Sequence, residues 1–319
     1  MRIFFALVSL LMLLQAKEAT LSDTLKVDGS INDMSIKNGK IYISTDSGMA
    51  NVIDLKTKKS IKEFKFKKIK DFMGDLTDTN VYTIDENAGL FLFVLQGESG
   101  HSRVLLINKS GKRDFIINDN DALNIMKARF ISKDKILFGL MSSELILYDL
   151  KKRKNIYDKQ ISQMKFADFK LNKDKTKLAL SDEGGDIKIV DVKSGAIEKI
   201  LTGINKDNVY QVDFKNSIVA TAGKDKKCGI YNLKDGTSYY KESNFLVYSV
   251  GLSKDGKLCG YPSSDKNEVT IFDTTTKENL FTLKGGKSFV SNIIFLDKNH
   301  IVTSAKNKIK FWNLEGGNR

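Results

Sequence analysis

Hydrophobic residues between positions 166 and 203 fall into four short runs separated by polar turns. The runs span 166–172, 177–181, 186–192 and 196–201, and each is rich in Ile, Val, Leu or Phe. Lys, Asp, Asn, Ser and Gly fill the three connections, as they do in tight turns. The pattern predicts one antiparallel meander of four strands. Because a lone meander would leave both of its apolar faces in water, it needs neighbours of its own kind.

The same unit recurs along the chain. Its third strand ends in an apolar or aromatic residue that is followed by Asp or Asn. This signature appears as Ile53-Asp54, Ile107-Asn108, Tyr148-Asp149, Val190-Asp191, Tyr231-Asn232, Phe272-Asp273 and Trp312-Asn313. Successive Asp or Asn positions are 54, 41, 42, 41, 41 and 40 residues apart. A period of about 40–45 residues with four strands per unit is typical of a β-propeller blade. The chain is therefore predicted to be all-β, a seven-bladed propeller of four-stranded antiparallel blades.

The last blade is short of one strand. We expect blades at 31–66, 81–118, 127–161, 166–201, 209–241 and 248–283, and a seventh with strands only at 290–296, 300–304 and 308–314. The N-terminal segment 20–27 has apolar residues at Leu21, Leu25 and Val27. It is predicted to supply the missing outer strand, which closes the ring and removes an open sheet edge.

These repeats resemble the WD40/YVTN-like propeller superfamily over nearly the whole chain after residue 16. Of the tryptophans that end the third strand in tryptophan–aspartate repeats, only Trp312 is present, and Asn313 follows it. The Gly-His pair of that family precedes no blade. Ile53-Asp54-Leu55-Lys56-Thr57 and Val190-Asp191-Val192-Lys193-Ser194-Gly195 are similar to exported YVTN-type and quinoprotein-like blades.

The first sixteen residues form a separate segment. Arg2 precedes the apolar run from Ile3 to Leu14, which Gln15-Ala16 ends. The run is too short to span a bilayer, and one positive charge before it is typical of a secretory signal peptide. We predict a signal peptide at 1–16, cleaved near Ala16, a propeller domain at 17–319, and a periplasmic location. No cysteine follows the run, so a lipid anchor is not expected.

The two cysteines, Cys228 and Cys259, are predicted to be free and mostly buried. They belong to strands that begin at opposite faces of neighbouring blades, and a disulfide needs Cα atoms within about 7 Å.

Candidate chemistry is sparse. The two histidines, His101 and His300, lie on turns of different blades, and no haem-attachment motif occurs. Gly286-Lys287-Ser288 is similar to the end of a phosphate-binding loop, but Phe281 stands where the first glycine belongs and a strand follows instead of a helix. No nucleophile elbow accompanies either histidine. We therefore predict no catalytic residues, no metal and no cofactor. A lactonase-like site of carboxylates and amides from several blades stays open, since it would leave no local motif.

Charge is the most informative remaining feature. The formal net charge is +13, and removal of residues 1–16 takes away Arg2 alone, leaving +12. The first and third turns of every blade emerge on one face, and they are rich in lysine. The candidate partner-binding residues on this face are Lys58, Lys59, Lys151, Lys152, Arg153, Lys154, Lys173, Lys175 and Lys193. The opposite face is expected to be mixed or locally acidic, as at 118–121 and 181–185.

A basic face suits an acidic protein partner or an anionic membrane surface. The same lysines would also keep the surface soluble without binding anything. Nucleic acid is not expected, because the signal peptide directs the chain out of the cytoplasm. We predict a monomeric, non-enzymatic exported propeller that acts as a protein-interaction or assembly module. Its size, export signal and lysine content resemble NapL-like accessory proteins of periplasmic nitrate reductase systems, which implies contacts with reductase components. The alternatives are an exported propeller enzyme, lactonase- or hydrolase-like, and an envelope assembly scaffold.

Overall fold

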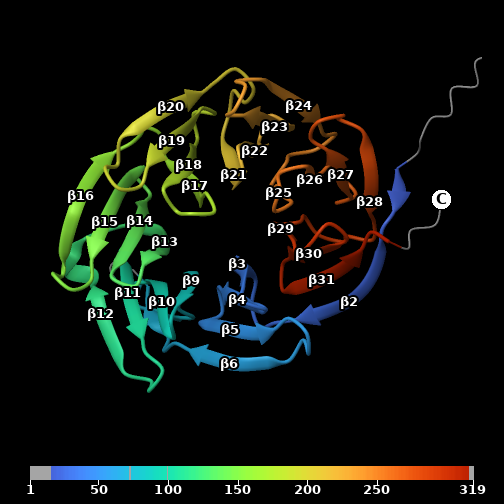
Figure 1. Ribbon diagram of the computed structural model, residues 1–319. Helices are drawn as coiled ribbons and strands as arrows, with labels where there is room; N and C mark the ends of the chain where they lie inside the picture. The colour runs from blue at the N-terminus through green and yellow to red at the C-terminus, as the bar shows by residue number, and fades with distance from the viewer. Residues whose placement is uncertain (1–15, 72, 99, 316–319) are drawn as a thin grey trace, which may run out of the picture.

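The strands form a ring of seven blades around a central axis (Figure 1). The computed structural model describes residues 16–71, 73–98 and 100–315. Each blade is an antiparallel sheet whose first strand lies innermost and whose fourth lies at the circumference. The seven-bladed, all-β prediction is confirmed. Among the described residues the one helix is a short 3₁₀ turn, η1 (Asp119–Asp121).

The blades follow one another in chain order. Blade 1 consists of β3 (Ile31–Lys37), β4 (Lys40–Thr45), β5 (Met49–Asp54) and β6 (Ser60–Lys65). Blade 2 consists of β9 (Val81–Asn87), β10 (Leu90–Gln96), β11 (Ser102–Ile107) and β12 (Arg113–Ile117). Blade 3 consists of β13 (Ile125–Ser132), β14 (Lys135–Leu140), β15 (Glu144–Asp149) and β16 (Lys154–Gln160).

Blades 4 to 7 continue the same pattern. Blade 4 consists of β17 (Phe166–Leu171), β18 (Lys177–Asp182), β19 (Ile187–Asp191) and β20 (Ile197–Leu201), and blade 5 of β21 (Val209–Lys215), β22 (Ile218–Gly223), β23 (Lys227–Asn232) and β24 (Ser238–Glu242). Blade 6 consists of β25 (Gly251–Leu252), β26 (Leu258–Pro262), β27 (Val269–Asp273) and β28 (Asn279–Leu283). Blade 7 consists of β29 (Asn292–Phe295), β30 (His300–Ala305), β31 (Lys308–Asn313) and the N-terminal β2 (Thr20–Lys26).

The N-terminal segment closes the ring as predicted. β2 pairs antiparallel with β31, from Thr20 opposite Asn313 to Lys26 opposite Lys308. In Figure 1 the blue β2 runs beside the red β31. The segment also reaches one blade further than expected, because β1 (Lys17–Glu18) pairs in parallel with β28 of blade 6. We call residues 17–26 the clasp. The clasp completes blade 7 and also joins blade 7 to blade 6.

The predicted signal peptide lies outside the described residues except for Ala16. The described part of the chain contains no helix that is long and apolar enough to cross a membrane. Export and processing at Ala16 stay predictions.

The core consists of layers between neighbouring blades. One cluster joins Ile31, Met34 and Ile41 of blade 1 to Ile309 and Phe311 of blade 7, and other clusters fill other seams in the same way. The second and third strands are covered on both faces, so they read as nearly continuous hydrophobic runs, whereas the fourth strands are largely exposed. Each blade thus buries its apolar faces only because the ring is complete.

Ala19 tests the clasp. It is 5% exposed and packs in the layer between blades 6 and 7, near Trp312 and Leu314. Because a buried carboxylate is costly and overfills the layer, Ala19→Glu should lower the free energy of unfolding by roughly 2–4 kcal/mol. Thr20→Glu, at the exposed neighbouring position, should change it by about 0.5 kcal/mol or less. Equal urea-unfolding midpoints for the two variants would show that the clasp does not contribute to stability.

The two cysteines are free and buried, as predicted, but the expected distance between them is wrong. The sulfur atoms of Cys228 and Cys259 lie 3.9 Å apart in the layer between blades 5 and 6. The expectation compared the ends at which the two strands begin. Both side chains instead point into the same seam, and the strands of twisted neighbouring blades cross there. The side of the sheet on which a residue lies decides its neighbours more than its distance from a strand end.

Both thiols should be unreactive in the folded protein. Burial raises the pKa of Cys259 well above its ordinary value, and the adjacent Cys228 reinforces this, while the thiolate is the reactive form. We expect a disulfide-exchange reagent to modify neither cysteine over minutes in buffer and both in guanidinium chloride. Rapid modification of the native protein would contradict the packing of this seam.

The extra residues between blades 1 and 2 form a small projection. β7 (Ile69–Lys70) pairs with β8 (Leu76–Thr77), and Met73 at the tip and Leu76 are exposed. The other insertion, at 96–101, is a longer connection between β10 and β11. Phe72 and Ser99 lie outside the described residues.

Candidate functional site

The ring has two chemically different faces. We call one the hairpin face; it carries the turns between the first and second strands and between the third and fourth strands of each blade. The loop face carries the remaining turns and the connections between blades. Candidate binding residues are found on both.

All nine predicted basic residues lie in turns or strand ends of the hairpin face. Three of them already have carboxylate partners: Lys58 Nζ lies 2.6 Å from Asp23, Lys151 Nζ lies 3.0 Å from Asp134, and Arg153 pairs with Asp114.

Lys175 is directed inward, where its Nζ donates to the carbonyl of Phe130 and burial lowers its pKa. The five remaining basic residues make no ion pair with any residue in the described ranges: Lys59, Lys152, Lys154, Lys173 and Lys193. They come from blades 1, 3 and 4. The hairpin face is basic, but its free charges are spread around the ring.

Aspartates on the inner strands link blade 2 to blade 3, blade 4 to blade 5 and blade 5 to blade 6. Asp85 accepts a hydrogen bond from the backbone N–H of Phe130 at 2.8 Å, and Asp213 accepts one from Leu252 at 2.9 Å. Asp168 does the same toward blade 5, where Val212 N–H donates at 3.2 Å. These bonds satisfy buried backbone donors that would be costly to leave unpaired.

An ion-pair network that includes Asp168 joins the inner strands of blades 1, 3 and 4. Arg129 of blade 3 donates to both carboxylate oxygens of Asp33 of blade 1 at 2.7 Å, and Lys127 pairs with Asp168. This network was not predicted from the sequence: Arg129 and Asp33 belong to blades that are not adjacent, and Lys127 and Asp168 are 41 positions apart on the inner strands of blades 3 and 4. Because each charged group of the network pairs with another group of the network, we assign the network a role in stabilising the ring.

Charge pairing in the channel makes stability depend on pH. Burial raises the pKa of Asp33, but Arg129 and Lys127 outweigh burial and hold the pKa below its ordinary value of 3.8. Asp213 is similar: burial raises its pKa, and Lys215 and Lys170 bring it below 3.8. A carboxylate with a depressed pKa in the folded state stabilises the fold above 3.8, and this contribution is lost as pH falls through the folded value.

Asp33→Asn tests this network. At neutral pH the variant leaves Arg129 buried without its partner and should lose roughly 3–5 kcal/mol of stability. Below pH 3.8, the free energy of unfolding of the unaltered protein should fall with pH more steeply than that of the variant, which cannot titrate there. Urea denaturation across a pH series measures both slopes. The exposed control Asp28→Asn should keep the original slope, and an equal slope for Asp33→Asn would contradict the assignment.

Four aromatic residues gather on the loop face at the channel side of blades 5, 6 and 7. The rings of Tyr210 and Tyr248 stack with centroids 5.1 Å apart, and Phe289 lies 4.9 Å from Tyr248. Phe245 lies 6.4 Å from Tyr248. Phe245 and Phe289 are 42% and 49% exposed, so their rings are available to a partner. We call these four residues the aromatic cluster.

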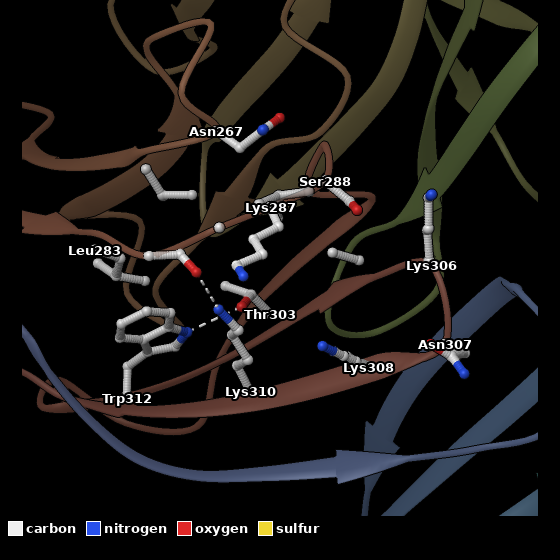
Figure 2. Close-up of a pocket in the computed structure, with 15 residues that line it drawn as sticks. Asn267, Leu283, Lys287, Ser288, Thr303, Lys306, Asn307, Lys308, Lys310 and Trp312 are labelled. Atoms are coloured by element: carbon white, nitrogen blue, oxygen red, sulfur yellow. Dashed lines mark hydrogen bonds between the residues drawn. The ribbon is translucent and has the colours of Figure 1, made fainter.

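A pocket of about 250 Å³ opens beside the aromatic cluster, between blades 6 and 7 (Figure 2). Its walls are the loop from β28 to β29 and the start of β31. Trp312 and Leu283 form part of an apolar floor, and Trp312 Nε1 donates to Thr303 Oγ1 at 2.9 Å. Phe289 follows the pocket residues Lys287 and Ser288 on the same loop, so one loop contributes to both the pocket and the aromatic cluster.

Lysines line the pocket without any carboxylate. They are Lys287, Lys306, Lys308 and Lys310. Lys310 Nζ donates to the carbonyl of Gly285 at 2.8 Å and lies 5.5 Å from the centroid of the Trp312 ring. Figure 2 shows the ammonium groups of Lys287, Lys308 and Lys310 directed into the pocket and that of Lys306 directed away. The pocket thus combines positive charge with an apolar floor.

Burial, with a further contribution from Lys308, lowers the pKa of Lys310. A negative charge in the pocket would counteract both effects. This site was not predicted, because the loop face was expected to be mixed or locally acidic. The alternation of Lys308 and Lys310 on β31 was an available signal, since positions two apart on a strand share a face.

A second cavity, of about 330 Å³, lies where blade 1 meets the insertion at 67–80. Its lysines are accompanied by Asp28 and Asp78, and Lys68 Nζ is 3.5 Å from Asp78. Its three lysines thus face two carboxylates, whereas the lysines of the first pocket face none. Among the residues that the structure describes, no three His, Cys, Asp or Glu side chains are placed to hold a metal ion. His300 lies at the surface, 2.9 Å from Asp297.

Comparison with known proteins identifies the architecture. No protein-family description and no curated protein match the sequence. A chain in the crystal structure of the mitotic checkpoint complex is similar in structure, with a TM-score of 0.75, 15% sequence identity, and coverage of 94% of this chain and 93% of that chain. The chain has a WD40-like propeller fold. Because 1847 chains of solved structures match, the fold alone does not select a partner.

Proposed function

We propose that this propeller is a non-enzymatic interaction module that binds a protein partner on its loop face, at blades 5 to 7. The aromatic cluster is the observation that carries the proposal. Exposed aromatic rings close to one another are the side chains that most often dominate binding energy at protein interfaces. Tyr210 lies on β21, and the other three rings lie on the connections between blades, where they pack against one another.

The buried polar groups support binding in preference to catalysis. The charged side chains of the channel, Asp33, Arg129, Lys127 and Asp168, pair with one another. A catalytic carboxylate or base would need to face a substrate with its reactive atoms available. The loop face offers aromatic rings and lysines, which are recognition groups.

We further propose that the protein is exported and supports a periplasmic nitrate reductase system by contacting its components. The segment 1–16 and the resemblance of the lysine-rich propeller to NapL-like accessory proteins support this proposal. The basic hairpin face is a second candidate surface, for an acidic partner or an anionic membrane.

Two variants separate the candidate surfaces. One replaces Phe245 and Phe289 by Ser, and the other replaces Lys151, Lys152, Arg153 and Lys154 by Glu. Purified reductase components are passed over the immobilised full-length protein, and the dissociation constants are compared by biolayer interferometry. The aromatic variant should bind about 30-fold or more weakly, as expected when hot-spot rings are removed. The charge-reversed variant should keep the affinity and lose only part of the association rate.

The opposite ranking would place the interface on the hairpin face. Lack of binding to the unaltered protein would overturn the nitrate reductase assignment. In-cell crosslinking then tests the broader proposal. If no partner crosslinks near the aromatic cluster, the loop face is not the interface. Both variants should retain the unfolding temperature of the parent, since the replaced side chains are exposed.

A further inference from the structure

The repeated blades provide an internal comparison for Lys310. In blade 7, Lys310 lies opposite Thr303 in the β30–β31 pair. In blade 4, Lys188 lies opposite Leu180 in the equivalent β18–β19 pair. Lys188 therefore occupies the position in blade 4 that Lys310 occupies in blade 7.

The two lysines differ in their partners. Lys188 Nζ donates to the carboxylate of Asp182, which is fully buried. Asp182 ends the second strand of blade 4, and Ala305 ends the second strand of blade 7 at the matching position, two residues beyond the register partner of the lysine. Blade 7 keeps the lysine and lacks the carboxylate. None of the residues described by the structure forms an ion pair with Lys310.

We propose that the pocket between blades 6 and 7 binds an acidic segment of the partner protein, one of whose carboxylates lies beside Lys310 as that of Asp182 lies beside Lys188. The inference rests on the proposed function and names the chemistry of the partner. Lys287 and Lys308, directed into the same space, suit a segment with more than one acidic side chain.

Backbone donors add to the positive charge. Gly285 has φ +88°, and the loop that follows it lines the pocket. The backbone N–H groups of Gly286, Lys287 and Ser288 donate to no acceptor among the described residues. Such groups bind carboxylate oxygens well, especially beside ammonium groups.

The exposed ring of Phe289, on the loop that lines the pocket, argues for a peptide over a free inorganic anion, because Trp312 and Leu283 are themselves only 5% and 2% exposed. A phosphate ion could contact the lysines but would leave the ring of Phe289, which is 49% exposed, without a partner. A peptide can place acidic side chains beside the lysines and an apolar side chain on Phe289 and the aromatic cluster. Acidic residues beside apolar ones are therefore the expected recognition sequence.

Trp312 provides a direct readout, because it is the one tryptophan of the chain and lies in the pocket. The probe is a capped peptide, Ser-Glu-Leu-Glu-Glu-Phe-Ser, titrated into the full-length protein while tryptophan fluorescence is recorded. We expect a saturable change with this peptide and none with its counterpart in which every Glu is Gln.

Two variants of the pocket sharpen the test. Ala305→Asp supplies the missing carboxylate from within the chain, and Lys310→Met removes the cation. Each should weaken peptide binding roughly tenfold or more, the effect of losing a charge-assisted hydrogen bond. Thr202→Asp adds the same charge to an exposed loop between blades 4 and 5 on the same face. It should change the affinity by less than about twofold, because distant exposed charges are screened.

The outcomes decide between occupants. Equal saturation by inorganic phosphate or by free glutamate, at the same concentrations as the peptide, would overturn the peptide assignment in favour of a small anion. Lack of any saturable signal, or unchanged affinity in Ala305→Asp, would overturn the site itself. Partner capture that depends on Phe245 and Phe289 but not on Ala305 would leave the interaction module standing and reject the pocket. Peptide binding without any partner capture would do the reverse.

Discussion

Every blade of this protein has two apolar faces and no means of covering either by itself, so closure of the ring is the constraint on which the structure depends. The layers between blades bury the second and third strands, and at three of the seams an inner-strand aspartate binds the backbone of the next blade. At the last seam the chain must use its other end: β2 completes blade 7, and β1 extends the contact to blade 6. The binding surfaces follow from the same closure. The aromatic cluster and the lysine pocket are each built from more than one blade, and neither would exist on an isolated sheet.

Much of the fold could be predicted because it repeats. The Asp or Asn that follows each third strand counted the blades, and a seventh blade without an outer strand assigned Thr20–Lys26 its place. Other features depend on how repeats meet. Arg129 and Asp33 are 96 positions apart and pair only because the inner strands converge on one axis. Cys228 and Cys259 were expected to be apart because strand ends were compared, although the side of the sheet decides which seam a side chain enters. β1 is two residues long and carries no periodic pattern to predict it.

The candidate sites show the same division. The nine basic residues lie in turns or at strand ends of one face, but their ion-pair partners could not be predicted from the sequence. Asp23 and Asp114 balance Lys58 and Arg153 from neighbouring blades. Conversely, Lys310 was not predicted as a binding residue, because in the sequence nothing distinguishes it from the other lysines of a basic chain. Its significance comes from comparison with Lys188, which requires the strand register of both blades. The comparison is possible because the two blades share a backbone: the same lysine position has a carboxylate partner in blade 4 and none among the described residues in blade 7.

The seam between the chain ends also sets the order in which the protein can fold. Ser22 donates a hydrogen bond to the carbonyl of Phe311, 289 positions away. β2 therefore cannot pair with β31 until synthesis is almost complete, and until then the arc of blades 1 to 6 has an open side at each end. Closing the loop between β2 and β31 costs conformational entropy, and only the contacts of the completed seam offset this cost. A propeller fastened by its first and last strands therefore postpones its final structure until nearly the whole chain is available.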